Sequence, residues 1–272
     1  MDLTQTALPN EQLTAEAFNR QSSVFDELNA GNCIETYMRT KVRAHVEAFL
    51  PANSKILELN AGTGIDAVYF AGKGHSVHAT DVASSMQGTL KHKVAEAHLE
   101  HLITAETCSF TQLAQLQKKQ EYDAVFSNSG GLNCTPHLQT VLQSFSPLVK
   151  KGGTVTMAIM GRYCLWEMLH VFRGNFKLAL RRLKNGADAH IEGVHFKCWY
   201  YQPSYVINAL KQEFNVVRVE GLCTFVPPSY FENFPTKHPG LYKRLVKMEE
   251  KYSTTFPWKN IGDYFIITLQ KK

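Results

Sequence analysis

The sequence has no closely spaced cysteines. Its six cysteines occur singly, with no Cys-x-x-Cys pair and no paired histidines at the spacing of a zinc site. This scatter argues against a zinc-binding module and favours reduced, structural thiols. We therefore expect no zinc. The six are Cys33, Cys108, Cys134, Cys164, Cys198 and Cys223.

Long apolar runs are also missing. Nowhere do about eighteen consecutive apolar residues occur, the length that a membrane-spanning helix needs. The start, MDLTQTALPNEQ, has no basic segment followed by an apolar one, as a secretory leader would. These two absences predict a cytoplasmic protein with no membrane partner.

The charge is only mildly one-sided. Lys and Arg number 29 and Asp and Glu 24, a formal net charge of +5. This excess suits an anionic ligand, but it falls well short of the basic stripe of a dedicated nucleic-acid binder. With 272 residues, of which 44% are hydrophobic, the chain can bury one substantial core with additions.

Short apolar runs alternate with amphipathic segments from residue 55 to residue 160. Such alternation predicts an α/β fold with a parallel sheet and helices on both of its faces. Four helix-like segments separate the five strand-like runs, and the third of these helices is expected at FTQLAQLQKK. The runs are SKILELN, HSVHATD, HLITAETC, YDAVFSNS and GTVTMAIM.

The flanking segments follow a different pattern. Apolar positions three and four residues apart predict two amphipathic helices before Pro51. After Gly161, YCLWEMLHVFRGNFKLALRRLKNG has the periodicity of one or two helices, which we interpret as an inserted cap. The regular pattern then returns from residue 203 and brings the expected number of strands to seven.

The segment LELNAGTG, residues 57–64, carries the clearest functional signal. Gly62 and Gly64 allow a sharp turn and a close approach of a ligand, and the following helix start favours an anionic group. Asp81 ends the second strand, 17 residues after Gly64, where a carboxylate can accept hydrogen bonds from a ribose diol. The ligand should therefore contain a nucleoside.

Two nucleoside ligands fit this loop. GTGIDA satisfies the dinucleotide fingerprint G-x-G-x-x-A literally, which would suit NAD. Three features favour S-adenosylmethionine instead: the acid Glu58 inside the first strand, the Ser-Asn-Ser-Gly-Gly turn after the fourth strand, and the segment LVKKGGTVTM. The missing second mononucleotide half also argues against NAD.

At these motifs the chain resembles class I S-adenosylmethionine-dependent methyltransferases, in the branch of the ubiquinone/menaquinone- and biotin-pathway enzymes. LELNAGTGIDAVYFA resembles their first motif, ATDVASSM the second, YDAVFSNSGGLNC the fourth and LVKKGGTVTM the fifth. The resemblance implies a Rossmann-like, seven-stranded, mostly parallel sheet whose last strand, in GDYFIITLQKK, is antiparallel. It further implies S-adenosyl-L-methionine as cofactor and S-adenosyl-L-homocysteine as product.

The resemblance also implies a set of cofactor-binding residues. Glu58, Asn60, Gly62 and Gly64 would frame the methionine moiety, Asp81 would bind the ribose hydroxyls, and Val82 and Met86 would lie against the adenosine. Cys108, Ser109 and Phe110 would border the adenine, and Asn128 and Gly130 would lie beneath the sulfonium. Asn60 replaces the usual first glycine, and Cys108 stands near a position that is often Asp.

We expect a single domain over residues 1–272. Residues 1–50 would form an N-terminal helical lid, 51–160 the cofactor-binding core, 161–205 the substrate cap and 206–272 the C-terminal part of the sheet. Phe18, Phe25 and Tyr37 on the N-terminal helices would either pack or close over the cofactor.

The methyl acceptor is less constrained. The fourth motif lacks the Asn/Asp-Pro-Pro-Tyr/Phe pattern of amino-methylating nucleic-acid and protein-glutamine enzymes, and after Met157 the chain offers no Asp/Asn cluster for magnesium. A general base is needed only for acceptors that must lose a proton, and His195 is one candidate among several histidines, tyrosines and acids.

The leading hypothesis is methyl transfer to a small, partly aromatic or apolar metabolite by a monomer or homodimer. One alternative is an RNA methyltransferase. Another is a non-catalytic module that binds S-adenosylmethionine or NAD. The methylated atom, the pathway and the oligomeric state stay open at this point.

Overall fold

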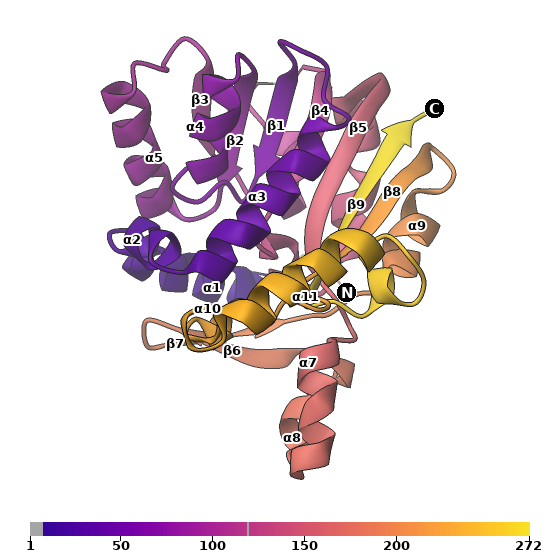
Figure 1. Ribbon diagram of the computed structural model, residues 1–272. Helices are drawn as coiled ribbons and strands as arrows, with labels where there is room; N and C mark the ends of the chain where they lie inside the picture. Colours follow the sequence, from indigo (N-terminus) through magenta and orange to yellow (C-terminus); the bar gives the residue numbers. More distant parts are fainter. Residues whose placement is uncertain (1–7, 119) are drawn as a thin grey trace.

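A computed structural model describes residues 8–118 and 120–272 and contains one central sheet of seven strands (Figure 1). The strand order is β3-β2-β1-β4-β5-β9-β8. The first five strands in this order are parallel, and β9 runs antiparallel to both of its neighbours. The predicted fold class is thus confirmed. The strands are β1 (Lys55–Leu59), β2 (Ser76–Asp81), β3 (Ile103–Thr107), β4 (Tyr122–Ser127), β5 (Val149–Met160), β8 (Phe214–Leu222) and β9 (Tyr264–Lys271).

Helices cover both faces of the sheet and form two apolar cores. In β1, four of five residues are buried, and Leu57 pairs with His78 of β2 on one side and Val125 of β4 on the other. Central parallel strands read as near-continuous apolar runs because both faces are covered. One core contains η2 (Phe110–Gln115), α6 (Leu138–Gln143) and α9 (Pro203–Leu210), and the other contains α3 (Cys33–Glu47), α4 (Ile65–Gly72) and α5 (Ser84–Glu96), with α11 (Pro239–Tyr252) packed against it.

The other short helical segments join the strands. The predicted helix FTQLAQLQKK is only the 3₁₀ segment η2, and its position 119 lies outside the described residues. The connections contain η3 (Gly131–Cys134), η4 (Ser146–Leu148), η7 (Ser229–Phe231), α10 (Phe234–Lys237) and η8 (Trp258–Asn260).

From residue 8 onward, three helices, rather than the predicted two, precede β1. They are α1 (Leu8–Gln21), α2 (Phe25–Ala30) and α3. The chain turns between Gln21 and Phe25, and the Asn32 side chain caps α3 by accepting hydrogen bonds from the backbone N–H groups of Ile34 and Glu35. This cap separates α2 from α3. The first seven residues of the expected lid lie outside the described part of the chain.

The segment after β5 differs from the one or two helices that we expected. It begins with four short helical segments, broken where Gly174 adopts a φ of +72° and Asn175 caps the next turn. A β-hairpin that we did not predict follows. Its turn holds Glu192 and Gly193, both at positive φ, and the alternating burial of VHFKC marks its second strand. The segments are α7 (Leu165–Met168), η5 (Leu169–Arg173), α8 (Phe176–Ala179), η6 (Arg181–Leu183), β6 (Ala187–Ile191) and β7 (Val194–Cys198).

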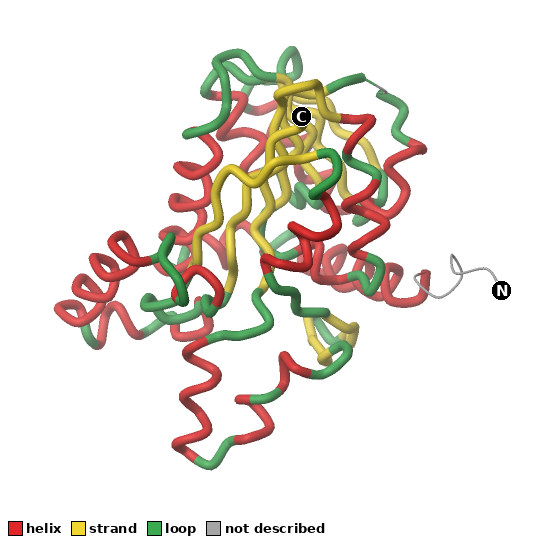
Figure 2. The backbone as a smooth tube through the Cα atoms, turned by 90° about the vertical axis from the view of Figure 1, so that its right-hand side faces the viewer, coloured by secondary structure: helices red, strands yellow, loops and turns green. Residues whose placement is uncertain are grey.

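Figures 1 and 2 show where these parts lie. The helical segments α7 to η6 extend away from the body of the molecule, whereas the hairpin β6–β7 stays close to it. Helix α1 packs on this hairpin, with Ala17 in one apolar cluster with Val194 and Phe196. The Asn10 side chain adds hydrogen bonds to the backbone of Cys134 and Lys197. The N-terminal helices and the hairpin therefore form one cover over the end of the sheet.

Candidate active site

The loop after β1 is built for a sharp turn. Asn60, Gly62 and Gly64 have φ values of +46°, +56° and +76°, in the left-handed region that favours glycine and tolerates asparagine. At Gly64 a Cβ atom would lie 1.9 Å from Cδ1 of Leu90 in α5, so helix and loop approach too closely for a side chain. The loop leads directly into α4, whose first N–H groups face the carboxyl end of the sheet.

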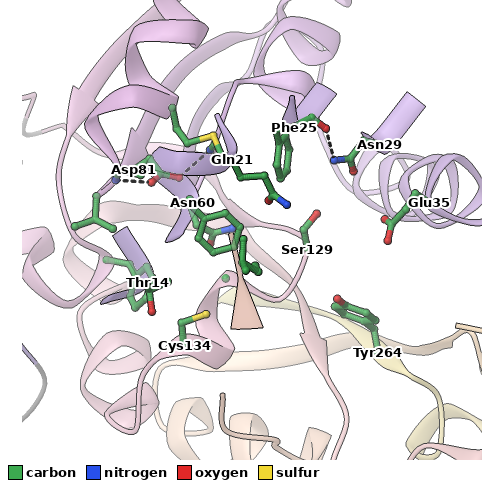
Figure 3. A pocket seen from close by; sticks show the side chains of 18 residues that line it. Thr14, Gln21, Phe25, Asn29, Glu35, Asn60, Asp81, Ser129, Cys134 and Tyr264 are labelled. Atoms are coloured by element: carbon green, nitrogen blue, oxygen red, sulfur yellow. Dashed lines mark hydrogen bonds between the residues drawn. The ribbon is translucent and has the colours of Figure 1, made fainter. Parts of the chain in front are cut away.

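Asp81 ties this loop to the end of β2. Its carboxylate accepts hydrogen bonds from the backbone N–H groups of Gly62 and Ala83, each at 2.8 Å (Figure 3). Burial raises the pKa of the Asp81 carboxyl, while these N–H groups oppose the shift. The carboxylate is thus held in a fixed place at the wall of a cavity.

The cavity has a volume of about 280 Å³ and lies at the carboxyl ends of the strands. Six of the twelve residues predicted to bind the cofactor line it: Asn60, Gly62, Asp81, Val82, Met86 and Phe110. Phe18 and Phe25, two of the three aromatics considered for the lid, also line it. The lining residues that we did not predict there are Thr14, Gln21, Asn29, Glu35, Ala83, Ser129, Gly131, Cys134, Ile191 and Tyr264.

The other six predicted residues do not line the cavity. Among them Glu58 is buried, and its Oε2 atom has no hydrogen-bond partner among the described residues. Burial, and next the negative charge of Asp66, raise the pKa of Glu58 well above its ordinary value. The full set is Glu58, Gly64, Cys108, Ser109, Asn128 and Gly130.

Asp66 is the centre of a charged network behind the loop. Arg39 and Arg43 of α3 each contact its carboxylate at 2.7 Å, and the Asn128 side-chain amide donates to it at 2.9 Å. Asn60 links the same region to β4, because its Nδ2 donates to the Asn128 carbonyl oxygen at 2.8 Å. Asn128 therefore fixes the loop from behind.

Of residues 108–110, only one lines the cavity. Phe110 lines the cavity, whereas Cys108 and Ser109 lie behind it. Burial raises the pKa of the Cys108 thiol to about 11. The Ser109 hydroxyl caps η2 and bonds to the Glu11 carboxylate of α1. Helix α1 is thereby fixed to the loop after β3.

The N-terminal helices close the cavity. Phe18 from α1 and Phe25 from α2 line it, and Ile191 contributes from the hairpin. Tyr37, the third aromatic that we considered for the lid, does not line it. The amphipathic pattern of these helices identified aromatic candidates, but no local signal in the sequence pointed to Ile191, because the hairpin itself was not predicted.

The cavity also has a polar end, away from Asp81. Glu35 of α3, Asn29 of α2, Ser129 after β4 and Tyr264 at the start of β9 point toward it (Figure 3). Burial first, and then the charges of Asp263 and Glu35, raise the pKa of the Tyr264 hydroxyl, so it stays protonated at neutral pH. This end can donate and accept hydrogen bonds and can hold a positive charge.

His195, the residue predicted as a base, does not line this cavity. It is exposed on β7, between the buried residues Val194 and Phe196, so it faces the opposite side of the hairpin. Its ring lies 4.5 Å from that of His190. Period-2 alternation of the strand turns it away from the cavity.

The place of β9 decides between the two nucleoside-binding folds. A dinucleotide-binding sheet has the all-parallel order 3-2-1-4-5-6, whereas here the antiparallel β9 is inserted between β5 and β8. Residues 56–153 match a family model described as a methyltransferase domain. These residues are thus a methyltransferase domain, in a sheet with the fold of class I S-adenosylmethionine-dependent methyltransferases.

Solved structures share the fold of this methyltransferase domain. An S-adenosylmethionine-dependent methyltransferase from Mesorhizobium loti is 15% identical, with a TM-score of 0.54, over 84% of this chain and 96% of that chain. The 1,6-didemethyltoxoflavin-N1-methyltransferase of Burkholderia thailandensis is 13% identical, with a TM-score of 0.57, over 96% and 88%. Geranyl diphosphate C-methyltransferase of Streptomyces coelicolor A3(2) is 11% identical, with a TM-score of 0.55, over 86% and 79%.

These identities show likeness of fold and not of substrate. No curated protein matches the methyltransferase chain in sequence. The resemblance to the ubiquinone/menaquinone and biotin branch therefore stays a prediction.

Proposed function

We propose that this protein transfers the methyl group of S-adenosylmethionine to a small metabolite bound in the cavity. The observation that carries the proposal is one cavity with Asp81 at one end and Tyr264 at the other. A donor and an acceptor can meet there. The cofactor supplies an activated methyl group, and the chain has to position the acceptor and exclude solvent.

The cofactor would lie along the loop after β1. Asp81 would accept hydrogen bonds from the ribose hydroxyls, and the start of α4 would attract the carboxylate of the methionine moiety. Val82, Met86 and Phe110 supply apolar surface for the adenine. Glu58, Gly64 and Asn128 would act by shaping the loop, since they do not line the cavity.

The acceptor would lie at the polar end. Glu35 can bind an N–H or O–H group of the acceptor, or take its proton, and Tyr264 can donate a hydrogen bond to it. The aromatic rings of Phe18 and Phe25 suit an acceptor that is otherwise apolar. The two named enzymes of the same fold, for geranyl diphosphate and 1,6-didemethyltoxoflavin, are likewise named for small molecules.

An RNA acceptor fits this site less well. The cavity of about 280 Å³ is slightly smaller than the usual range for small-molecule sites, which is about 300–1,000 Å³. The cover of α1, α2 and the hairpin would have to open for a flipped base. A regulatory module without turnover has no need for the polar acceptor end. We therefore favour the metabolite.

Label transfer from methyl-tritiated S-adenosylmethionine into a cell extract tests the proposal. The extract is separated into small-molecule, RNA and protein fractions after incubation with the protein or with its Asp81→Ala variant. We expect counts in the small-molecule fraction that disappear with the variant. Counts confined to RNA would contradict the small-metabolite acceptor, and no transfer into any fraction would contradict the assignment of turnover.

A further inference from the structure

The segment of residues 161–184 forms an arm that leaves the body of the molecule. It contains α7, η5, α8 and η6 and extends from the carboxyl end of β5 (Figures 1 and 2). The buried Arg182 fixes its base, because it donates hydrogen bonds to the carbonyl oxygens of Gly161 and Asp263 and pairs with the carboxylates of Glu167 and Asp263. The arm is therefore held in a defined direction.

Large apolar side chains are concentrated on the arm. Seventeen large hydrophobic residues are exposed in the described chain, and eight of them lie within these 24 residues. Phe172 is 86% exposed and Phe176 is 58% exposed. A contiguous exposed apolar surface on a globular protein usually marks an interaction site. The eight are Tyr163, Met168, Leu169, Val171, Phe172, Phe176, Leu180 and Leu183.

The net charge of the whole chain is also concentrated there. The arm holds six Lys and Arg residues and one acid, Glu167, a formal charge of +5. The other 248 residues hold 23 of each sign (29 − 6 and 24 − 1), so they are neutral in sum. Glu167 is buried and bound by Arg181 and Arg182, and the exposed cations are Arg162, Arg173, Lys177 and Lys184.

We propose that the arm docks onto the surface of an anionic lipid bilayer. Exposed apolar side chains can enter the boundary between headgroups and acyl chains, while Lys and Arg bind the anionic headgroups. In a dimer formed through the arm, one arm of formal charge +5 would face another of the same charge, so charge disfavours self-association there. No helix in the described residues is long and apolar enough to cross a membrane.

This inference replaces our expectation of no membrane partner. That expectation came from the lack of a spanning run, a criterion that does not detect a surface-binding arm. The arm begins at the carboxyl edge of the sheet, where the cavity also lies. Docking would hence bring the cavity close to the bilayer.

Sedimentation with lipid vesicles tests the proposal on the full chain without cofactor, so the result does not depend on methyl transfer. Vesicles of phosphatidylcholine with one third phosphatidylglycerol are compared with phosphatidylcholine alone. We expect binding to the anionic vesicles that falls as salt increases. Phe172→Ser with Phe176→Ser should weaken it at least about tenfold, as should Arg173→Gln with Lys177→Gln.

Matched variants control for general effects. Phe256→Ser removes a phenylalanine that is 79% exposed outside the arm, and Lys243→Gln with Lys247→Gln removes two exposed lysines of α11. Both should bind vesicles like the unmodified protein, and all variants should keep its melting temperature. An unmodified protein that ignores anionic vesicles, or arm variants that bind unchanged, would overturn the proposal. So would retention of a structured RNA, or an arm-dependent dimer in light scattering, in place of vesicle binding.

Discussion

The Asp81 carboxylate accepts a hydrogen bond from the backbone N–H of Gly62 at 2.8 Å, which joins the end of β2 to the loop after β1. One side chain thus holds the turn in shape and presents a negative charge to the cavity. The loop needs a positive φ at Gly62 for this contact. The same pair, Asp81 and Gly62, therefore sets both the shape of the loop and the position of the carboxylate for a ligand.

Gly64 should be essential for stability. In Gly64→Ala the new Cβ meets Leu90 and the backbone keeps a φ of +76°, so we expect a loss of roughly 2–4 kcal/mol. Thermal unfolding should show a melting temperature lower by roughly 5–15 °C.

Gly88→Ala is the matched control. Gly88 lies inside α5 with no atom near its Cβ position, so alanine should stabilise the protein by about 0.5–1 kcal/mol. Equal melting temperatures for Gly64→Ala and the unmodified protein would contradict the packing of the loop on α5.

Glu35 and Tyr264 should affect turnover and not cofactor affinity. Removing a positioned proton acceptor or donor typically costs about 10²–10⁴-fold in rate, so we expect Glu35→Gln and Tyr264→Phe to fall in this range. Label transfer measures the rate, and titration calorimetry measures the affinity for S-adenosylhomocysteine.

Glu27→Gln, an exposed acid of α2, is the control for Glu35→Gln and should behave like the unmodified protein. Full activity of both Glu35→Gln and Tyr264→Phe would contradict the assignment of the polar end as the acceptor site. A parallel loss of affinity would place them at the cofactor instead.

Two buried carboxyls should change the stability of the protein with pH in opposite directions. Burial, and then the charge of Asp66, raise the pKa of Glu58 in the folded protein. Its contribution to stability is therefore present below pH 4.5, its ordinary pKa, and is lost as pH rises through the folded-state pKa. Glu58→Gln cannot ionise, so its stability relative to the unmodified protein should grow between pH 5 and pH 9.

Glu220 provides the opposite case. Burial alone would raise its pKa, but the hydrogen bond to His45, with Lys41 and Arg218, lowers it to about 2. Its contribution is therefore present above 4.5 and lost as pH falls toward 2. Glu220→Gln should be ~1–3 kcal/mol less stable than the unmodified protein at pH 7, and this difference should shrink as pH falls from 4.5 toward 3. Urea unfolding from pH 3 to pH 9 measures both differences, and differences that do not change with pH would contradict both assignments.

The sequence predicted the sheet well because its signals are local. Apolar runs, the glycines after β1 and Asp81 at the end of β2 each act through neighbouring residues, and the structure brings Gly62 and Asp81 together as expected. The cover of the cavity could not be predicted in the same way. Ile191, Glu35 and Tyr264 reach it from the hairpin, α3 and β9, which are far apart in sequence.

Two errors have identifiable causes. The apolar spacing of residues 163–183 predicts a helical cap and masks the strand alternation of VHFKC that follows the Glu192–Gly193 turn. His195 has the chemistry of a base, but the alternation of its strand turns it away from the cavity. Side-chain chemistry alone does not determine which residues share a cavity.

The most direct test of the central claim is the binding of S-adenosylhomocysteine by titration calorimetry to the unmodified protein, Asp81→Ala and Asp188→Ala. Asp188 is an exposed acid of β6 outside the cavity and serves as the control. Two charge-assisted hydrogen bonds are worth about 1.5–3 kcal/mol each, so Asp81→Ala should weaken binding at least about a hundredfold, with Asp188→Ala unchanged. Equal affinity of all three proteins would contradict the site at the ends of β1 and β2.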